Sequence, residues 1–246
     1  MKLGDRLQAL VDFVPEGSKV ADVGTDHAYL ALELMQSGRA DFVVASDKNS
    51  GPLEAAHRSI REQGWDDKIS IRQGDGLAVL EPGEVDIVCI AGMGGLLMTE
   101  ILTAEPAVVK KLKRLVLQPM NGAAELRRWL YRHAWHIADE SLAVDDGRIY
   151  EIICAEKGRE KMPDALTLLL GPKLWEKKSP LLRYHIEQLL FQTRRIKGDM
   201  EKSPRARKTK KYQELEKQIV ELEERLRHSA SPAKSDASMG GKTYAD

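Results

Sequence analysis

Long apolar runs are absent from this sequence of 246 residues. No stretch reaches the roughly 18 apolar residues that span a bilayer, so the composition excludes a membrane role. The first residues, MKLGDRLQALVDFVPEG, also lack the uninterrupted apolar segment and small-residue cleavage site of a signal peptide. We therefore expect a soluble protein that stays in the cytoplasm.

Cysteine is scarce as well. The two cysteines, Cys89 and Cys154, each stand inside an apolar run typical of a strand. Isolated cysteines in such runs favour reduced, buried thiols over a disulfide framework or a zinc site. We expect no metal centre.

The chain has no net charge, but its charges are unevenly distributed. Residues 1–107 carry 9 Lys and Arg against 18 Asp and Glu, whereas residues 108–246 carry the remaining 29 Lys and Arg against 20 Asp and Glu. A basic half beside an acidic half is typical of a protein that faces a polyanion on one side. Unevenly charged, solvated helix faces would give the same counts.

Short apolar runs alternate with amphipathic stretches as far as about residue 135, which is typical of a parallel sheet covered by helices. Two further strand-like runs meet at Asp145-Asp146-Gly147, a strong hairpin pattern. We predict an α/β fold with a doubly wound, seven-stranded, mostly parallel, Rossmann-like sheet. The predicted parallel strands are 18–23, 41–46, 68–72, 85–91 and 114–119.

After Lys157 the strand pattern ends and two heptad-like seams follow, from Leu182 to Met200 and from Tyr212 to Leu226. The basic segment EKSPRARKTKK between them predicts a chain reversal, and hence an antiparallel coiled-coil hairpin. We expect an α/β domain over 1–157, the helical hairpin over 158–228, and a disordered tail over 229–246, which is small, polar and aperiodic.

The segment DVGTDHA, residues 22–28, follows the first predicted strand, where open parallel sheets bind ligands. Gly24 permits a tight turn and a close approach to a ligand. The other glycines of a dinucleotide fingerprint are missing, and Asp22 and Asp26 would repel a pyrophosphate. The turn therefore argues against NAD and favours a ligand with a positive centre.

Acidic residues also end the next two predicted strands. Asp47 is placed to accept hydrogen bonds from ribose hydroxyls, and Asp75 in QGDGL can accept from the exocyclic amine of an adenine. Three acidic residues after three successive strands suit S-adenosylmethionine. Each of them alone could instead be a helix cap or an ordinary turn residue.

The string DVGTDHAYL, with SDKN, GDG, AGMGG and LQPMN at successive strand ends, resembles the bacterial tRNA adenine-N1 methyltransferases that modify adenosine 22. The resemblance covers Leu3 to about Arg227. It implies a class I methyltransferase domain that methylates N1 of an adenine in the tRNA D-arm, and a hairpin that helps to grip the RNA. The wider class often has Asn-Pro-Pro-aromatic where this chain has AGMGG, which argues against N6 methylation.

The resemblance and the strand-end pattern together predict the cofactor-binding residues. They are Asp22, Gly24, Thr25, Asp47, Lys48, Asp75, Gly76, Ala91, Gly92, Met93 and Gly94.

For the target base, Asp26 is expected to accept from the adenine amine and to offset the charge that develops on the ring. His27 and Tyr29 would shape the pocket or stack in it, and Asn121 would hold the base edge. His27 could equally be a packing residue at a helix N-terminus.

Clustered cations are the candidates for RNA contact, since they bind phosphates. These are Arg127, Arg128, Arg132, Arg148, Lys202, Arg205, Arg207, Lys208, Lys210 and Lys211. A solubilising turn would have the same composition. We expect a monomer whose partner is tRNA. The alternatives are a class I methyltransferase acting on another RNA, or a non-catalytic RNA-binding scaffold.

Overall fold

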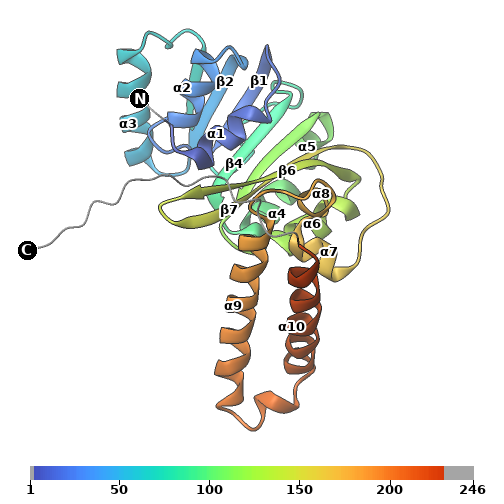
Figure 1. Cartoon of the computed structure of the whole chain (residues 1–246). Coiled ribbons are helices and arrows are strands. Elements are labelled where there is room, and N and C mark those ends of the chain that lie inside the picture. Colours follow the sequence, from blue (N-terminus) through green and yellow to red (C-terminus); the bar gives the residue numbers. More distant parts are fainter. Residues whose placement is uncertain (1–2, 230–246) are drawn as a thin grey trace, which may run out of the picture. The chain divides into compact units, whose positions relative to one another are not determined.

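The computed structural model describes residues 3–229, and a seven-stranded sheet forms the centre of its first part (Figure 1). The strand order is β3-β2-β1-β4-β5-β7-β6, with β1 to β5 parallel and β7 antiparallel to both β5 and β6. The predicted doubly wound sheet is confirmed. Its strands are β1 (Ser18–Val23), β2 (Ala40–Asp47), β3 (Ile69–Gln73), β4 (Ile87–Met93), β5 (Arg114–Pro119), β6 (Trp135–Asp145) and β7 (Arg148–Lys157).

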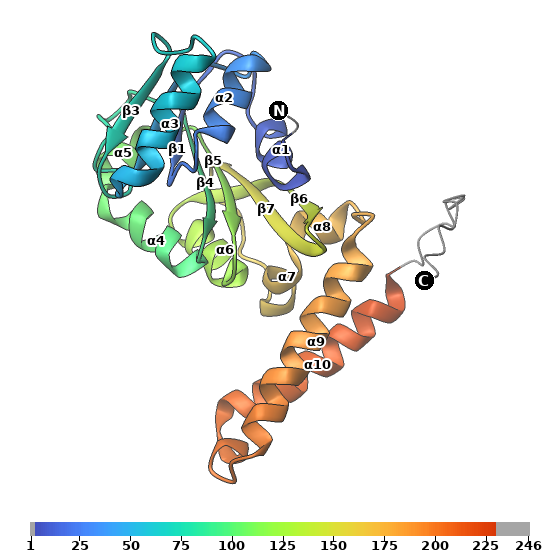
Figure 2. The same ribbon diagram turned by 90° about the vertical axis from the view of Figure 1, so that its left-hand side faces the viewer.

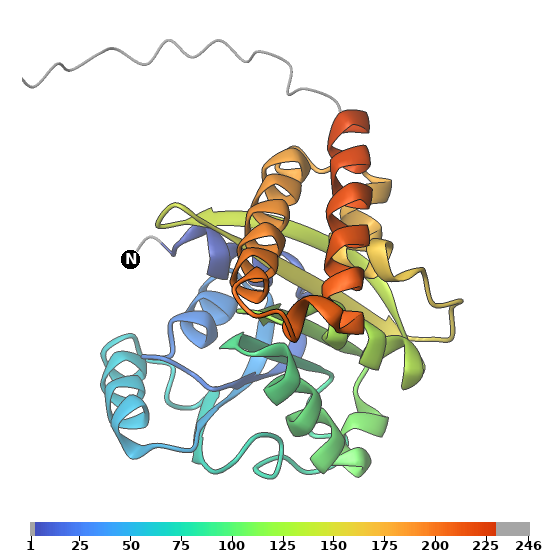
Figure 3. The same cartoon turned by 90° about the horizontal axis from the view of Figure 1, so that it is seen from below.

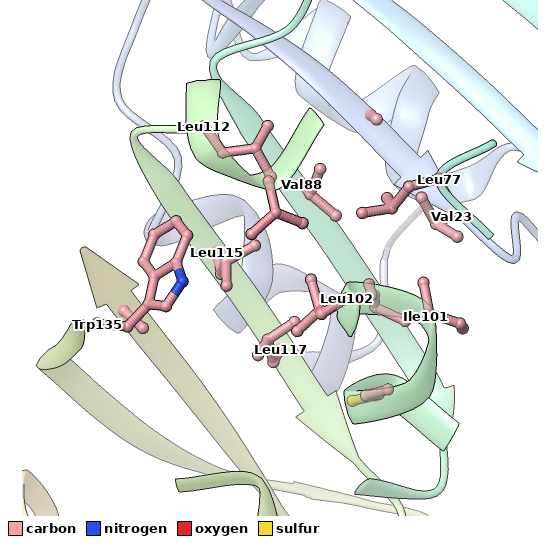
Figure 4. Close-up of a cluster of buried hydrophobic side chains, with 14 of the residues drawn as sticks. Val23, Leu77, Val88, Ile101, Leu102, Leu112, Leu115, Leu117 and Trp135 are labelled. Carbon is pink, nitrogen blue, oxygen red and sulfur yellow. The ribbon is translucent and has the colours of Figure 1, made fainter. Parts of the chain in front are cut away.

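Helices cover both faces of this sheet because successive strand residues point to opposite sides. Along β4, Val88 and Ile90 belong to one buried apolar cluster and Cys89 belongs to the other. The cluster of Val88 and Ile90 is filled from α4, α5 and α6 and appears in Figure 4, whereas the second is filled from α1, α2 and α3. The helices are α1 (Asp5–Asp12), α2 (Tyr29–Gln36), α3 (Ser50–Glu62), α4 (Gly95–Ala104), α5 (Pro106–Lys111) and α6 (Ala123–Arg132).

Two short helices, α7 (Ala165–Leu170) and α8 (Pro172–Glu176), complete this first unit, which ends at Ser179. They pack on α6 and β6, respectively. The expected boundary at residue 157 is corrected to Ser179 and Pro180 because these helices are part of the packed α/β unit. Their apolar stretches are too short for the sequence pattern to reveal this packing.

The second unit contains two helices that lie side by side, α9 (Leu182–Glu201) and α10 (Lys210–His228) (Figures 2 and 3). The 3₁₀ turn η1 (Ala206–Lys208) precedes α10, and the Thr209 hydroxyl caps that helix by accepting from the Tyr212 N–H at 3.3 Å. An ion pair between Arg194 and Glu223 crosses the two helices at 2.7 Å. The predicted helical hairpin is confirmed. Apart from Ser229, the predicted tail lies outside the described residues.

Candidate active site at the carboxyl edge of the sheet

The turn after β1 is fixed to the end of β2. The N–H groups of Gly24 and Thr25 both donate to the Ser46 carbonyl, each at 2.8 Å. Gly24 has a φ of +79°, and a Cβ there would lie 2.2 Å from Cε of Met93. The left-handed backbone favours glycine at this position, and the terminal methyl of Met93 occupies the space beside it.

Asp22 lies beneath this turn and is buried. The Thr25 hydroxyl donates to its Oδ2 at 2.7 Å. Burial raises the pKa of Asp22 to about 6; the bond from Thr25 opposes that rise, and the neighbouring Asp26 and Asp47 add to it. The ionised carboxylate is thus poorly stabilised by the protein itself, and a cationic ligand would favour it.

The ends of β2 and β3 are joined in the same way. The Gly74 N–H donates to the Asp47 carbonyl at 3.1 Å, and the Gln73 side-chain amide donates to the Lys48 carbonyl at 3.2 Å. Asp47 Oδ1 accepts from the Asn49 N–H at 2.7 Å. Together with the Ser46 carbonyl contacts, these bonds hold the three acidic turns next to one another.

A cavity of about 80 Å³ opens between these turns. Its acidic wall, Asp47 and Asp75, suits a cationic nucleoside such as S-adenosylmethionine. A ligand that approached the Gly24 backbone would have to displace the flexible Met93 side chain. The apolar wall, Leu97 and Ile101, was not predicted. The lining residues are Val23, Gly24, Ser46, Asp47, Lys48, Asn49, Gly74, Asp75, Gly76, Met93, Leu97 and Ile101.

Asp26 and His27 lie in the turn that leads into α2, and Tyr29 is the first residue of that helix. The Asp26 side chain is 81% exposed, and its Oδ1 lies 3.5 Å from Nε2 of His27. The rings of His27 and Tyr29 stack with centroids 5.3 Å apart. His27 and Ala28 both have positive φ, at 53° and 58°. Consecutive non-glycine residues in this region are strained, as is common at functional sites.

The loops after β4 and β5 are joined next to this turn. The Met120 N–H donates to the Met93 carbonyl at 2.8 Å, and the Gly95 N–H donates to the Asn121 carbonyl at 2.9 Å. A Cβ on Gly94 would lie 3.2 Å from Asn121 Oδ1. Because Met93 also reaches Gly24, the structure connects Asn121 to the turn that carries Asp26.

Gln118, in β5, holds the end of β4 in place next to these loops. It was missed as a site residue. Its side chain is fully buried, and Oε1 accepts from Arg6 Nη1 at 2.8 Å and from the Gly92 N–H at 3.1 Å. The Arg6 guanidinium also lies over the Tyr150 ring, 5.6 Å from its centroid. The one indication in the sequence was a polar residue inside the apolar run of β5.

The chain is similar to known proteins both in sequence and in structure. The family model described as tRNA (adenine(22)-N(1))-methyltransferase matches residues 20–224. The chain belongs to this family. The curated tRNA (adenine(22)-N(1))-methyltransferase of Bacillus subtilis is 35% identical over 234 residues, which are 93% of this chain and 98% of that protein.

Solved structures extend the comparison to three dimensions. The crystal structure of the Bacillus subtilis tRNA methyltransferase TrmK has a TM-score of 0.77 and 33% identity, covering 92% of this chain and 96% of that one. A Streptococcus pneumoniae protein in complex with S-adenosyl-L-methionine has a TM-score of 0.81 and 31% identity, covering 92% of this chain and all of that one.

One of the predicted RNA contacts in this member of the TrmK family is wrong. Arg127 is fully buried, where it pairs with Glu140 and Glu151, both at 2.6 Å, and donates to the Leu168 carbonyl at 2.9 Å. It joins α6 to the β6–β7 hairpin and to α7. Arg127 therefore cannot reach a phosphate, and its role is structural.

The other RNA candidates are accessible. The Arg128 side chain is 32% exposed and lies 4.0 Å from Glu125. Arg132 and Arg148 are exposed on the first unit, at the end of α6 and the start of β7. The exposed cations around the turn of the helical hairpin are Lys202, Arg205, Arg207, Lys208, Lys210 and Lys211.

Within residues 3–229, no group of three or more His, Cys, Asp or Glu side chains is arranged to hold a metal ion. None of the helices in that range is long and apolar enough to cross a membrane.

Proposed function

We propose that this chain transfers a methyl group from S-adenosylmethionine to N1 of adenosine 22 in tRNA. The observation that carries the proposal is the cavity bordered by Gly24, Asp47 and Asp75 in a chain that belongs to the tRNA (adenine(22)-N(1))-methyltransferase family. Asp22, Asp47 and Asp75 would hold the cationic and nucleoside parts of the cofactor. The backbone of Gly92 to Gly94 would border the reacting centre.

When bound, S-adenosylmethionine supplies an electrophilic methyl group on a sulfonium. The protein then has to align adenine N1 with that carbon and exclude water, which supplies most of the acceleration in such a transfer. The lone pair of N1 forms the new N–C bond as the C–S bond breaks, and no proton has to move. No strong base is needed.

The target adenine must leave its paired or stacked position because N1 lies on the Watson–Crick edge. We propose that Asp26 accepts from the adenine amine and offsets the positive charge of the methylated ring. Its exposure leaves the carboxylate accessible to a base. The stacked pair His27 and Tyr29 would form a side of the pocket, and Asn121 would hold the base edge.

The basic residues at the hairpin turn would bind tRNA phosphates, together with Arg128, Arg132 and Arg148. We further propose that the protein acts as a monomer. Its tRNA substrate would be met in the cytoplasm.

The decisive experiment is methyl transfer from labelled S-adenosylmethionine to unmodified tRNA, followed by nucleoside analysis. We expect N1-methyladenosine, and we expect its loss when adenosine 22 is replaced by guanosine. Cofactor binding without transfer to any unmodified tRNA would favour another RNA substrate or a non-catalytic scaffold.

A further inference from the structure

Two large apolar side chains, Leu96 and Met120, are exposed beside the cofactor cavity. Leu96 is 68% exposed and Met120 is 46% exposed. Leu97, the neighbour of Leu96, is 46% exposed and lines the cavity. Single exposed apolar residues are ordinary, but a group of them at the mouth of a binding site indicates a contact surface.

Leu96 lies in the first turn of α4 and Met120 in the loop after β5, and these two segments are held against each other. The hydrogen bonds from Gly95 to Asn121 and from Met120 to Met93 join them. A Cβ on Gly95 would lie only 2.5 Å from the Gly122 carbonyl oxygen, so the two backbones are in direct contact. Leu96 and Met120 therefore flank one junction, which we call the apolar rim.

The position and the chemistry of the apolar rim indicate what covers it. Its two segments, MGGLL (93–97) and MNGA (120–123), contain no charged residue, so the rim is unsuited to phosphates. The rim adjoins the cavity through two of its lining residues, Leu97 and Met93, and the Met93 carbonyl accepts from the Met120 N–H. A base that enters the cavity beside Leu97 would lie next to the rim, and nucleobase faces are apolar.

We propose that Leu96 and Met120 pack against the nucleobases that flank the target adenine once this adenine has left the stack. An extruded base leaves its neighbours without a stacking partner, and inserted Leu or Met side chains compensate for that loss in other nucleic-acid complexes. This inference rests on the proposed function. It assigns RNA contact to residues without charge, whereas the basic residues position the backbone.

The test uses the full-length protein with Leu96→Ser, Met120→Ser and the double substitution. Met162→Ser is the matched control, since Met162 is 40% exposed in the same unit but lies outside the two rim segments. We expect the double variant to lose about tenfold or more in kcat/KM for tRNA, because lost base stacking has effects of that order. The dissociation constant for S-adenosylmethionine should stay within about twofold, and the control should behave as wild type.

A modified substrate gives an independent readout. With abasic residues on both sides of adenosine 22, wild type and the double variant should have the same kcat/KM, because the contact is already lost. A tRNA with 2-aminopurine in place of adenosine 22 should brighten on binding to wild type and much less on binding to the double variant. Since this signal needs no methyl transfer, it tests the inference even if the proposed reaction fails.

Three outcomes would overturn the inference. Equal activity of wild type and the double variant on intact tRNA would exclude base contact at the rim. A parallel loss of cofactor affinity would assign both side chains to the cofactor site. A wild-type dimer that the double substitution converts to monomers in sedimentation would identify the rim as an interface between copies.

Discussion

Thr25 and Asp22 form a buried hydrogen bond at the end of β1, with the Thr25 hydroxyl donating to Asp22 Oδ2 at 2.7 Å. Burial raises the pKa of Asp22 from 3.8 to about 6. A cationic cofactor favours the ionised carboxylate. The dissociation constant for S-adenosylmethionine should therefore fall as the pH rises from about 5 to about 7. Calorimetric titration with S-adenosylmethionine across this range measures the effect. Asp22→Asn should flatten the curve, and a flat wild-type curve would contradict the assignment.

The raised pKa of Asp22 also predicts how the stability of the ligand-free protein depends on pH. Because the folded pKa lies above the unfolded one, the native state binds more protons between about pH 4 and about pH 6, and the free energy of unfolding falls as the pH rises through that window. Asp22→Asn keeps an acceptor for Thr25 and removes the charge. It should stabilise the protein by about 3 kcal/mol at pH 7 and by little at pH 4, as measured by urea unfolding.

Asp26 should affect turnover and not cofactor affinity. We expect Asp26→Ala to lower kcat on the order of a hundredfold, because a carboxylate that offsets charge in the transition state is lost. The dissociation constant for S-adenosylmethionine should hardly change. Asp41→Asn is a suitable control, since Asp41 is exposed in β2 away from its carboxyl end. Equal losses in turnover and in cofactor affinity would make Asp26 a cofactor ligand or a helix cap.

Gly95 should be intolerant of even one methyl group. A Cβ there would meet the Gly122 carbonyl oxygen at 2.5 Å and the Asn121 carbonyl oxygen at 2.9 Å, and backbone atoms cannot rotate away. We expect Gly95→Ala to lower the free energy of unfolding by about 1–3 kcal/mol. Gly198→Ala, in α9 with no atom within 4 Å of its Cβ position, should instead stabilise the protein by about 0.5–1 kcal/mol. Denaturant midpoints of the two variants should move in opposite directions.

Arg127 should matter for folding and not directly for RNA. Arg127→Met leaves the fully buried Glu140 carboxylate without its guanidinium partner, and we expect a loss of about 3–5 kcal/mol in stability. Arg128→Ala, on the partly exposed face of α6, should cost less than about 0.5 kcal/mol. If the Arg127 variant unfolded like wild type but bound tRNA more weakly, the structural role would be refuted.

Local patterns were sufficient to predict the sheet and the position of its ligand edge. Val88 and Ile90 alternate with Cys89 between the two faces, Asp-Asp-Gly turns the chain into the β6–β7 hairpin, and acidic residues recur at strand ends. These features depend on residues close in sequence. The short helices α5, α7 and α8 fall below the length at which helical periodicity can be recognised.

Contacts between distant residues could not be predicted in the same way. Arg127 and Arg128 are adjacent and chemically alike, and only the position of Glu140 and Glu151 decides which of them is buried. Gln118 is separated from its partner Arg6 by 112 positions. A single sequence does not reveal which of many polar residues meet across such a separation.

The last prediction concerns the turn of the helical hairpin, where a substitution changes the charge and leaves the fold intact. Arg205→Glu should weaken tRNA binding, and the slope of log affinity against log salt should become shallower by about 1, since each lost phosphate contact releases about one counterion fewer. Arg205 is preferred to Arg207, whose Nε donates to the Glu201 carbonyl at 2.8 Å and so helps to hold the turn. At saturating tRNA, kcat should be unchanged because the cavity residues are untouched. Lys217→Glu is the control, since Lys217 is 78% exposed within α10, away from the turn, and pairs with Glu221. If Arg205→Glu and the control leave the affinity and the salt slope equally unchanged, the basic turn serves solubility and the tRNA is held by cations of the first unit.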